Sequence, residues 1–327
     1  MSWTRWKWPA SMPGEVSSLS DSILVFSTSD KGGTGRSVTS CNLAYRLSAK
    51  DYRVAYLDFD FGSPTSGALF EIEKMDRGVV EGNGLHQYFT GAVNPPVRYD
   101  IRSQTNRENL RAIRHPYELT LFPGDRGGGE FAATEPVVKK CIELMVICQQ
   151  EFDVIFVDLS AGRSAALEIV LRATAADPLQ SVESRWLVFH RWTRQHILAA
   201  NGLVHGPNGL LETGTNCGHD AGRLLDSVRY VRTAVPDTNE GEGDKDRGPQ
   251  WAWLREQNKA LEYLAQRNQL GESVTLGTTP VEPMLQWREQ LILDSDVDRN
   301  IANKGTVEAF EELADGLMNV ATWERLY

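Results

Sequence analysis

Short apolar runs alternate with longer amphipathic segments along most of the chain beyond residue 21. Runs that are almost continuously apolar are typical of strands buried on both faces, as in a parallel sheet between two layers of helices. The expected strands are residues 23–28, 53–60, 119–124, 153–159, 185–190, 227–233 and 273–277. The pattern predicts an α/β fold with a doubly wound, mostly parallel sheet and helices on both faces.

Helical spacing of apolar residues is clearest in three segments, 135–150, 251–264 and 305–327. The first places Cys141 and Cys148 on one apolar stripe, so we interpret both as core residues and not as a redox pair. The other two stripes consist of Trp251, Leu254, Leu261 and Leu264, and of Val307, Phe310, Leu313 and Leu317.

The domain organisation predicted from these patterns is simple. Residues 22–327 are expected to form a single domain. Residues 1–21, which mix three tryptophans with basic, Pro, Ser and Gly residues, are interpreted as a mobile tail that either folds back over the domain or binds a partner. The segment 236–250 is rich in charge and glycine, which predicts an exposed, mobile loop inside the domain.

Composition limits the classes of partner. The 327 residues carry a formal net charge of −10, which disfavours non-specific binding to DNA except through a local basic patch. The closing segment is acidic as well as amphipathic, so we expect it to pack on the core, with no stable membrane association. Four cysteines without a framework spacing, and no apolar run of about 18 residues, predict a cytoplasmic protein.

Six arginines are concentrated in the second half of the chain. Because no aromatic residues interleave with them in a nucleic-acid-reading motif, the expectation is a solvated basic face. These residues are Arg185, Arg191, Arg194, Arg223, Arg229 and Arg232.

The candidate chemistry begins in residues 29–37, SDKGGTGRS, which follow a predicted strand and precede a predicted helix. Glycines at 32, 33 and 35 let the backbone approach a phosphate closely, and the helix beginning near Arg36 adds the positive end of its dipole. Ser37 is placed to offer its hydroxyl to Mg²⁺.

Acidic residues at the ends of two other predicted strands accompany this loop. Asp158 ends the run DVIFVDL and is suited to ordering a Mg²⁺ shell. Asp58 and Asp60 end another run, and Asp60 is suited to positioning an attacking water. A glycine-rich turn alone is weak evidence, but the three features in this order indicate a nucleotide site.

The motifs KGGTGRS, DFDFGSPTSG, LTLFPG and FDVIFVDLSAG, in this order, resemble those of the ParA/MinD family of P-loop ATPases, which belongs to the SIMIBI class. The first resembles the family's deviant Walker A loop, the second its switch I, and the last its Walker B strand. The likeness extends to WLVFHRWTRQHILAANGLV and LGTTPVEP and covers most of residues 22–320.

The resemblance implies an ATP- and Mg²⁺-dependent sandwich homodimer, which positions or regulates an unidentified protein partner. Lys31 would cross to the phosphates of the other subunit, and with Asp60 it is a candidate catalytic residue. The candidate nucleotide-binding residues are Lys31, Gly32, Gly33, Thr34, Gly35, Arg36, Ser37, Val38, Pro280 and Glu282. The candidate metal ligands are Ser37, Asp60 and Asp158.

Two positions depart from the family pattern. Arg36 replaces the usual loop lysine, and its planar fork cannot occupy a compact ammonium site unchanged. Loops of the form KGGxGR[ST] mark a variant ParA-like subgroup. Residues 230–236, YVRTAVP, also lack the asparagine that the family often places there. Two hypotheses follow: a dimerisation switch with slow ATP hydrolysis, or a pseudo-ATPase scaffold cemented by nucleotide with negligible turnover.

Overall fold

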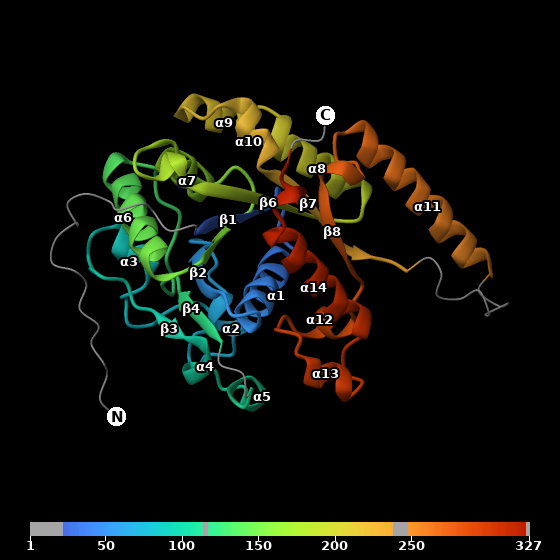
Figure 1. Cartoon of the computed structure of the whole chain (residues 1–327), viewed down its shortest axis with the longest axis horizontal. Coiled ribbons are helices and arrows are strands. Elements are labelled where there is room, and N and C mark those ends of the chain that lie inside the picture. The colour runs from blue at the N-terminus through green and yellow to red at the C-terminus, as the bar shows by residue number, and fades with distance from the viewer. Residues whose placement is uncertain (1–21, 114–116, 238–247, 325–327) are drawn as a thin grey trace.

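A computed structural model describes residues 22–113, 117–237 and 248–324 (Figure 1). The predicted tail at 1–21 lies outside the described residues, as do residues 238–247 of the predicted charged loop. The last three residues of that loop, 248–250, are helical, which corrects the prediction there.

One eight-stranded sheet forms the centre of the molecule, with strand order β3-β4-β2-β5-β1-β6-β7-β8. The strands are β1 Ile23–Thr28, β2 Arg53–Phe59, β3 Tyr99–Asp100, β4 Glu118–Phe122, β5 Val154–Leu159, β6 Glu183–Arg191, β7 Val228–Val235 and β8 Thr275–Pro280. All neighbours pair in parallel except β3 and β4, which are antiparallel. The doubly wound, mostly parallel sheet predicted from the sequence is confirmed.

Two strands differ from the prediction. The two-residue strand β3 was not predicted, because so short a segment carries no alternation that distinguishes it from a loop. The last predicted strand begins two residues late, since a 3₁₀ turn at Glu272–Val274 precedes β8.

Helices cover both faces of the sheet (Figure 1). One face packs against α3 Leu85–Phe89, α6 Glu135–Glu151, α7 Ala165–Ala175, α8 Arg194–His205, α9 Leu210–Cys217, α10 Ala221–Asp226 and the end of α11 Gly248–Arg267. The predicted stripe of α6 is buried there, with both cysteines inaccessible or nearly so.

The other face packs against α1 and the closing helix, which lie side by side in Figure 1. Its helices are α1 Arg36–Ala49, α2 Ser66–Leu69, α4 Ile101–Gln104, α5 Glu108–Arg111 and α14 Lys304–Met318. Short helices α12 Pro283–Trp287 and α13 Asp294–Asp298 pack beside α14. The four apolar residues predicted for the closing helix are buried in these two clusters, as expected.

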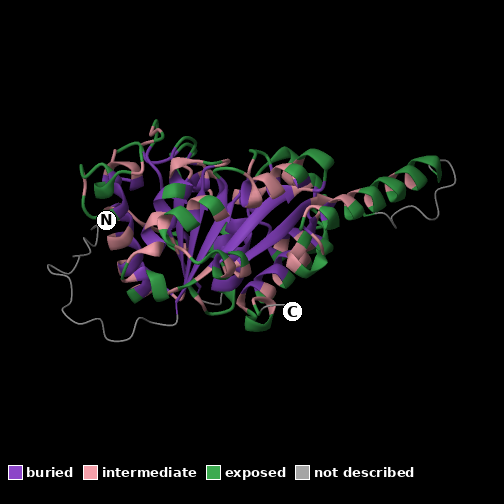
Figure 2. Ribbon diagram, turned by 90° about the horizontal axis from the view of Figure 1, so that it is seen from above, coloured by how far each residue is buried: buried purple, intermediate pink, exposed green. Residues whose placement is uncertain are grey.

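Helix α11 extends away from the body of the molecule, and Figure 2 shows it largely exposed. Ala265 is its only buried residue, while the predicted apolar stripe is half-buried. The Nε1–H of Trp192 donates to Asn258 at 2.7 Å and ties the helix to the body.

Three of the six arginines expected on a solvated face are buried, which corrects that prediction. Arg185 and Arg229 place their guanidinium groups 5.1 Å from the Trp323 ring centroid and donate to backbone carbonyls near the chain's end. Arg232 lies 4.4 Å from the Trp192 ring centroid and donates to the carbonyl of Leu270. Arg185 and Arg229 therefore hold the C-terminal segment against the sheet, and Arg232 holds the segment that follows α11, since carbonyls at helix ends need donors.

Candidate functional site

The glycine-rich loop connects β1 to α1 at the carboxyl edge of the sheet. Strand β1 lies between β5 and β6. The chain leads from β1 to β2 on one side and from β6 to β7 on the other, and ligands of doubly wound sheets bind where such connections diverge. Helix α1 begins at Arg36, as predicted, after Gly35 in the left-handed region with φ 74°. Gly33 has φ 71°, a backbone conformation that residues other than glycine rarely adopt.

The loop is held against β7, which is two strands away from β1 in the sheet. The Thr233 hydroxyl donates to the backbone carbonyl of Thr34 at 2.6 Å, and both residues are buried. This contact holds the middle of the loop over the end of the sheet.

Arg36 folds inward to two carboxylates, Asp158 on the adjacent strand β5 and Asp60 immediately after β2. Its Nε donates to Asp158 Oδ1 at 2.6 Å, and one terminal nitrogen donates to Asp60 Oδ2 at 2.9 Å. The same terminal nitrogen donates to Ser37 Oγ at 3.2 Å. Only 7% of the Arg36 side chain is exposed, so the two ion pairs are shielded from water.

Electrostatics keep this guanidinium charged. Burial by itself lowers the pKa of Arg36, but the carboxylates of Asp158 and Asp60 outweigh it and hold the pKa above the ordinary arginine value. A charged Arg36 compensates carboxylates that would otherwise repel each other.

Asp58 is the third carboxylate of the cluster and lies opposite Asp158 in the register of β2 and β5. Burial, together with the charge of Asp158, raises the pKa of Asp58 to about 7. Hydrogen bonds from the Ser66 hydroxyl at 2.5 Å and the Ser66 N–H at 3.2 Å act in the opposite direction. Asp58 therefore anchors the first turn of α2.

The three predicted metal ligands do not fit a magnesium ion as they are arranged. Mg²⁺ requires oxygen ligands at about 2.0–2.1 Å in octahedral geometry, whereas Ser37, Asp60 and Asp158 each contact the Arg36 guanidinium. Within residues 22–113, 117–237 and 248–324, no group of three or more His, Cys, Asp or Glu side chains is placed to hold a metal ion.

A cavity of about 280 Å³ opens beside the loop. Six of the candidate nucleotide-binding residues line it: Gly33, Thr34, Gly35, Val38, Pro280 and Glu282. The remaining four, Lys31, Gly32, Arg36 and Ser37, belong to the same loop and the first turn of α1 but do not line the cavity. The structure thus brings the loop and the late segment at 280–282 together around one space.

Comparison with known families decides the relationship. Residues 25–312 match the model of the CobQ/CobB/MinD/ParA nucleotide binding domain. The chain belongs to this family. No curated protein matches the sequence significantly.

Solved structures show that the chain has the MinD/ParA fold. The MinD cell division protein of Aquifex aeolicus superposes with a TM-score of 0.57 at 16% identity, over 91% of this chain and 97% of that one. The MinC:MinD complex of Aquifex aeolicus gives 0.60 at 16% identity, over 91% and 95%. A putative plasmid partition protein from Borrelia burgdorferi B31, bound to AMPPNP, gives 0.55 at 15% identity, over 91% and 98%.

In this ParA/MinD-type chain, Glu282 has a structural role besides lining the cavity. Its carboxylate accepts the Met284 and Asn303 N–H groups at 3.1 and 2.9 Å and the Thr306 hydroxyl at 2.7 Å. The side chain therefore joins α12 to the start of α14 and fixes the outer wall of the cavity.

Ten further residues line the cavity and were not predicted, because most of them lie on segments without a glycine-rich or acidic motif. Thr233 and Ala234 stand in the segment noted for its missing asparagine, and that position was the one available signal. The others are Thr39, Arg191, Thr279, Leu285, Gln286, Glu289, Thr306 and Phe310.

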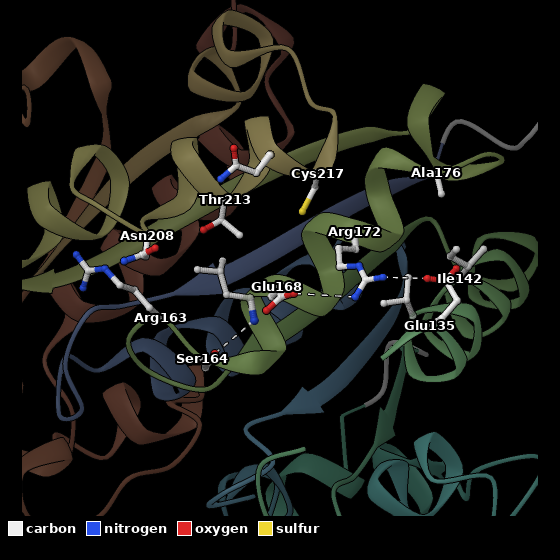
Figure 3. Close-up of a pocket in the computed structure, with 13 residues that line it drawn as sticks. Glu135, Ile142, Arg163, Ser164, Glu168, Arg172, Ala176, Asn208, Thr213 and Cys217 are labelled. Atoms are coloured by element: carbon white, nitrogen blue, oxygen red, sulfur yellow. Dashed lines mark hydrogen bonds and ion pairs between the residues drawn. The ribbon is translucent and has the colours of Figure 1, made fainter. Parts of the chain in front are cut away.

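A larger cavity of about 680 Å³ lies between α6, α7 and α9 on the other side of the sheet (Figure 3). Its arginines are already paired: Arg172 with Glu135 at 2.9 Å, and Arg163 with Asp30 at 2.9 Å. Because the chain itself balances this charge, the smaller cavity beside the glycine-rich loop is the better candidate site. No helix in the described part of the chain is long and apolar enough to cross a membrane.

Proposed function

We propose that this member of the family is a cytoplasmic, ATP-dependent homodimerisation switch that positions or regulates a partner assembly and hydrolyses ATP slowly. The observation that carries the proposal is the cavity whose wall contains Gly33, Gly35 and buried Thr34 of the loop. The base and sugar would occupy the cavity, while the phosphates would lie along the backbone N–H groups of the loop and the N-terminus of α1.

The loop also supports a role for Lys31 between subunits. Its side chain is exposed, and it forms no ion pair with any residue that the structure describes. An exposed ammonium beside a phosphate site is available to the phosphates of a second copy, where it would neutralise charge developing during transfer.

Slow turnover is proposed from the position of Arg36. Asp60, the residue suited to positioning the attacking water, is held by that guanidinium at 2.9 Å. Water activation at Asp60 would therefore require this ion pair to open first. The same contact favours the alternative function, a pseudo-ATPase scaffold in which bound nucleotide stabilises the dimer and is scarcely turned over.

Calorimetry with ATP and molar-mass measurements with a non-hydrolysable ATP analogue test the switch. We expect ATP to bind and the analogue to convert monomers to dimers, whereas Lys31→Ala should bind nucleotide and stay monomeric. Lys74→Ala is the matched control, since Lys74 is 84% exposed and distant in sequence from the loop. Absence of ATP binding by a folded protein, or full dimerisation of Lys31→Ala, would contradict the proposal.

Single-turnover hydrolysis separates the switch from the scaffold. Loss of one transition-state contact typically costs about 3 kcal/mol, or about a hundredfold in rate. We expect Arg36→Lys to hydrolyse ATP faster by up to that factor, with a much smaller change in affinity. A lysine variant that is no faster and binds more weakly would show that the arginine is an adapted ligand of the loop.

A further inference from the structure

One guanidinium occupies the centre of the predicted metal site. The hydroxyl of Ser37 and the carboxylates of Asp60 and Asp158 come from three different segments, yet all three accept hydrogen bonds from Arg36. These contacts use only Nε and one terminal nitrogen of Arg36.

The remaining terminal nitrogen of Arg36 has no hydrogen-bond partner among the described residues. A guanidinium is planar and holds its donors in a fixed fork, so Arg36 can contact the carboxylates with one side and still present two N–H groups to a further acceptor. Phosphoryl oxygens are the acceptors that arginine binds best, and Arg36 is the first residue of the helix that follows the loop.

The charge of Arg36 also favours a contact between its guanidinium and a phosphate. A divalent cation in a nucleotide site neutralises phosphate charge and links the phosphates to protein oxygens. Arg36 supplies a permanent positive charge and already holds the protein oxygens. A magnesium ion bound by Ser37, Asp60 and Asp158 would lie against the guanidinium that already contacts all three residues, and two positive charges at that separation repel each other.

From this arrangement, and resting on the proposed nucleotide binding, we infer that Arg36 takes the place of the divalent cation. Its guanidinium bridges Asp60 and Asp158 to a nucleotide phosphate. The chain therefore binds nucleotide without requiring magnesium, and the three oxygen ligands become a metal site only when the arginine is removed.

The first test measures ATP affinity by calorimetry in excess EDTA and in excess Mg²⁺. We expect wild-type affinity to change by less than about threefold between the two conditions. Arg36→Lys should bind at least about tenfold more weakly in EDTA than in Mg²⁺, because a compact ammonium lacks the planar fork that spans two carboxylates and a phosphate. Arg53→Lys is the control, since Arg53 forms an exposed ion pair with Asp153 at the opposite end of β2. A wild-type loss of about tenfold or more in EDTA would overturn the inference.

The second test needs no nucleotide and so distinguishes this inference from the proposed function. Binding of Mn²⁺ to the nucleotide-free protein is measured by the loss of the free-ion paramagnetic resonance signal, with folding checked by circular dichroism. We expect Arg36→Gln to gain one Mn²⁺ site that the wild type lacks, and addition of Asp158→Asn to remove it. If Arg36→Gln does not fold, Arg36→Lys serves in its place. Equal Mn²⁺ binding by wild type and variant would refute the inference even if ATP binds.

If ATP binds under neither condition, the proposed function fails, and the bridge from Arg36 to a nucleotide phosphate fails with it. The Mn²⁺ measurement then decides whether Arg36 excludes a metal from these carboxylates.

Discussion

Arg36 and Asp158 form a buried ion pair, and we expect a large coupling energy between the two side chains in the folded state. The contact is 2.6 Å long, and the two side chains are 7% and 2% exposed. With that contact distance as the charge separation and an effective dielectric constant of about 20, the Coulomb attraction is at most about 6 kcal/mol. Desolvation of both groups offsets much of this attraction.

A double-mutant cycle of Arg36→Met and Asp158→Asn measures the net coupling. Arg36→Met alone should lower the free energy of unfolding by about 3–5 kcal/mol, because it leaves Asp158 buried without a compensating charge. The double variant should recover part of that loss, with a coupling energy of about 2–3 kcal/mol.

Urea unfolding followed by circular dichroism, without nucleotide and in EDTA, provides the free energies. The exposed pair of Arg53 and Asp153 supplies a matched cycle, with an expected coupling of about 0–1 kcal/mol. Additive effects at Arg36 and Asp158, within about 0.5 kcal/mol, would refute the reasoning that the buried contact is energetically important.

Three further predictions concern positions around the loop. Burial lowers the pKa of His190 to about 4 from its ordinary 6.5. Because the fold favours neutral His190, its contribution to the free energy of unfolding should be fully present above about pH 6.5. As the pH falls through 4, the free energy of unfolding should decrease by about 3 kcal/mol. Urea unfolding across this range should show a smaller decline for His190→Phe, and an unchanged decline would exclude this residue as its cause. Thr233→Val should lower the free energy of unfolding by about 1–3 kcal/mol, since the buried carbonyl of Thr34 loses its donor; a loss below about 0.5 kcal/mol would contradict this. Gly35→Ala should lower the free energy of unfolding by about 1–2 kcal/mol because of the positive φ at this position. A clash would not contribute, since the new Cβ would lie 3.8 Å from Thr233, at ordinary contact distance. An unchanged unfolding midpoint would show that the loop relaxes without strain.

Local sequence patterns were sufficient for seven of the eight strands and for the start of the loop helix. Buried parallel strands need apolar side chains on both faces, so runs such as 23–28 and 153–159 are visible without any partner. Gly35 immediately before α1 is equally local, because the left-handed conformation at that position selects glycine whatever surrounds it.

The contacts of charged side chains were not predictable in the same way. Arg185, Arg229 and Arg232 look like surface residues in the sequence, but their partners are carbonyls and aromatic rings from distant segments. Burial of a charge depends on such partners, and a one-dimensional pattern does not contain them.

By itself, the sequence determined which seven segments form the longer strands and where the glycine-rich loop begins, because backbone conformation and apolar periodicity are properties of neighbouring residues. Only the tertiary structure decided what Arg36 does, since Asp158 and Asp60 reach it because β5 pairs with β1 and β2 pairs with β5 in the sheet. A guanidinium can contact phosphate, water or carboxylate, and the free energies of these choices depend on which charges lie near it in space and on how well water is excluded there.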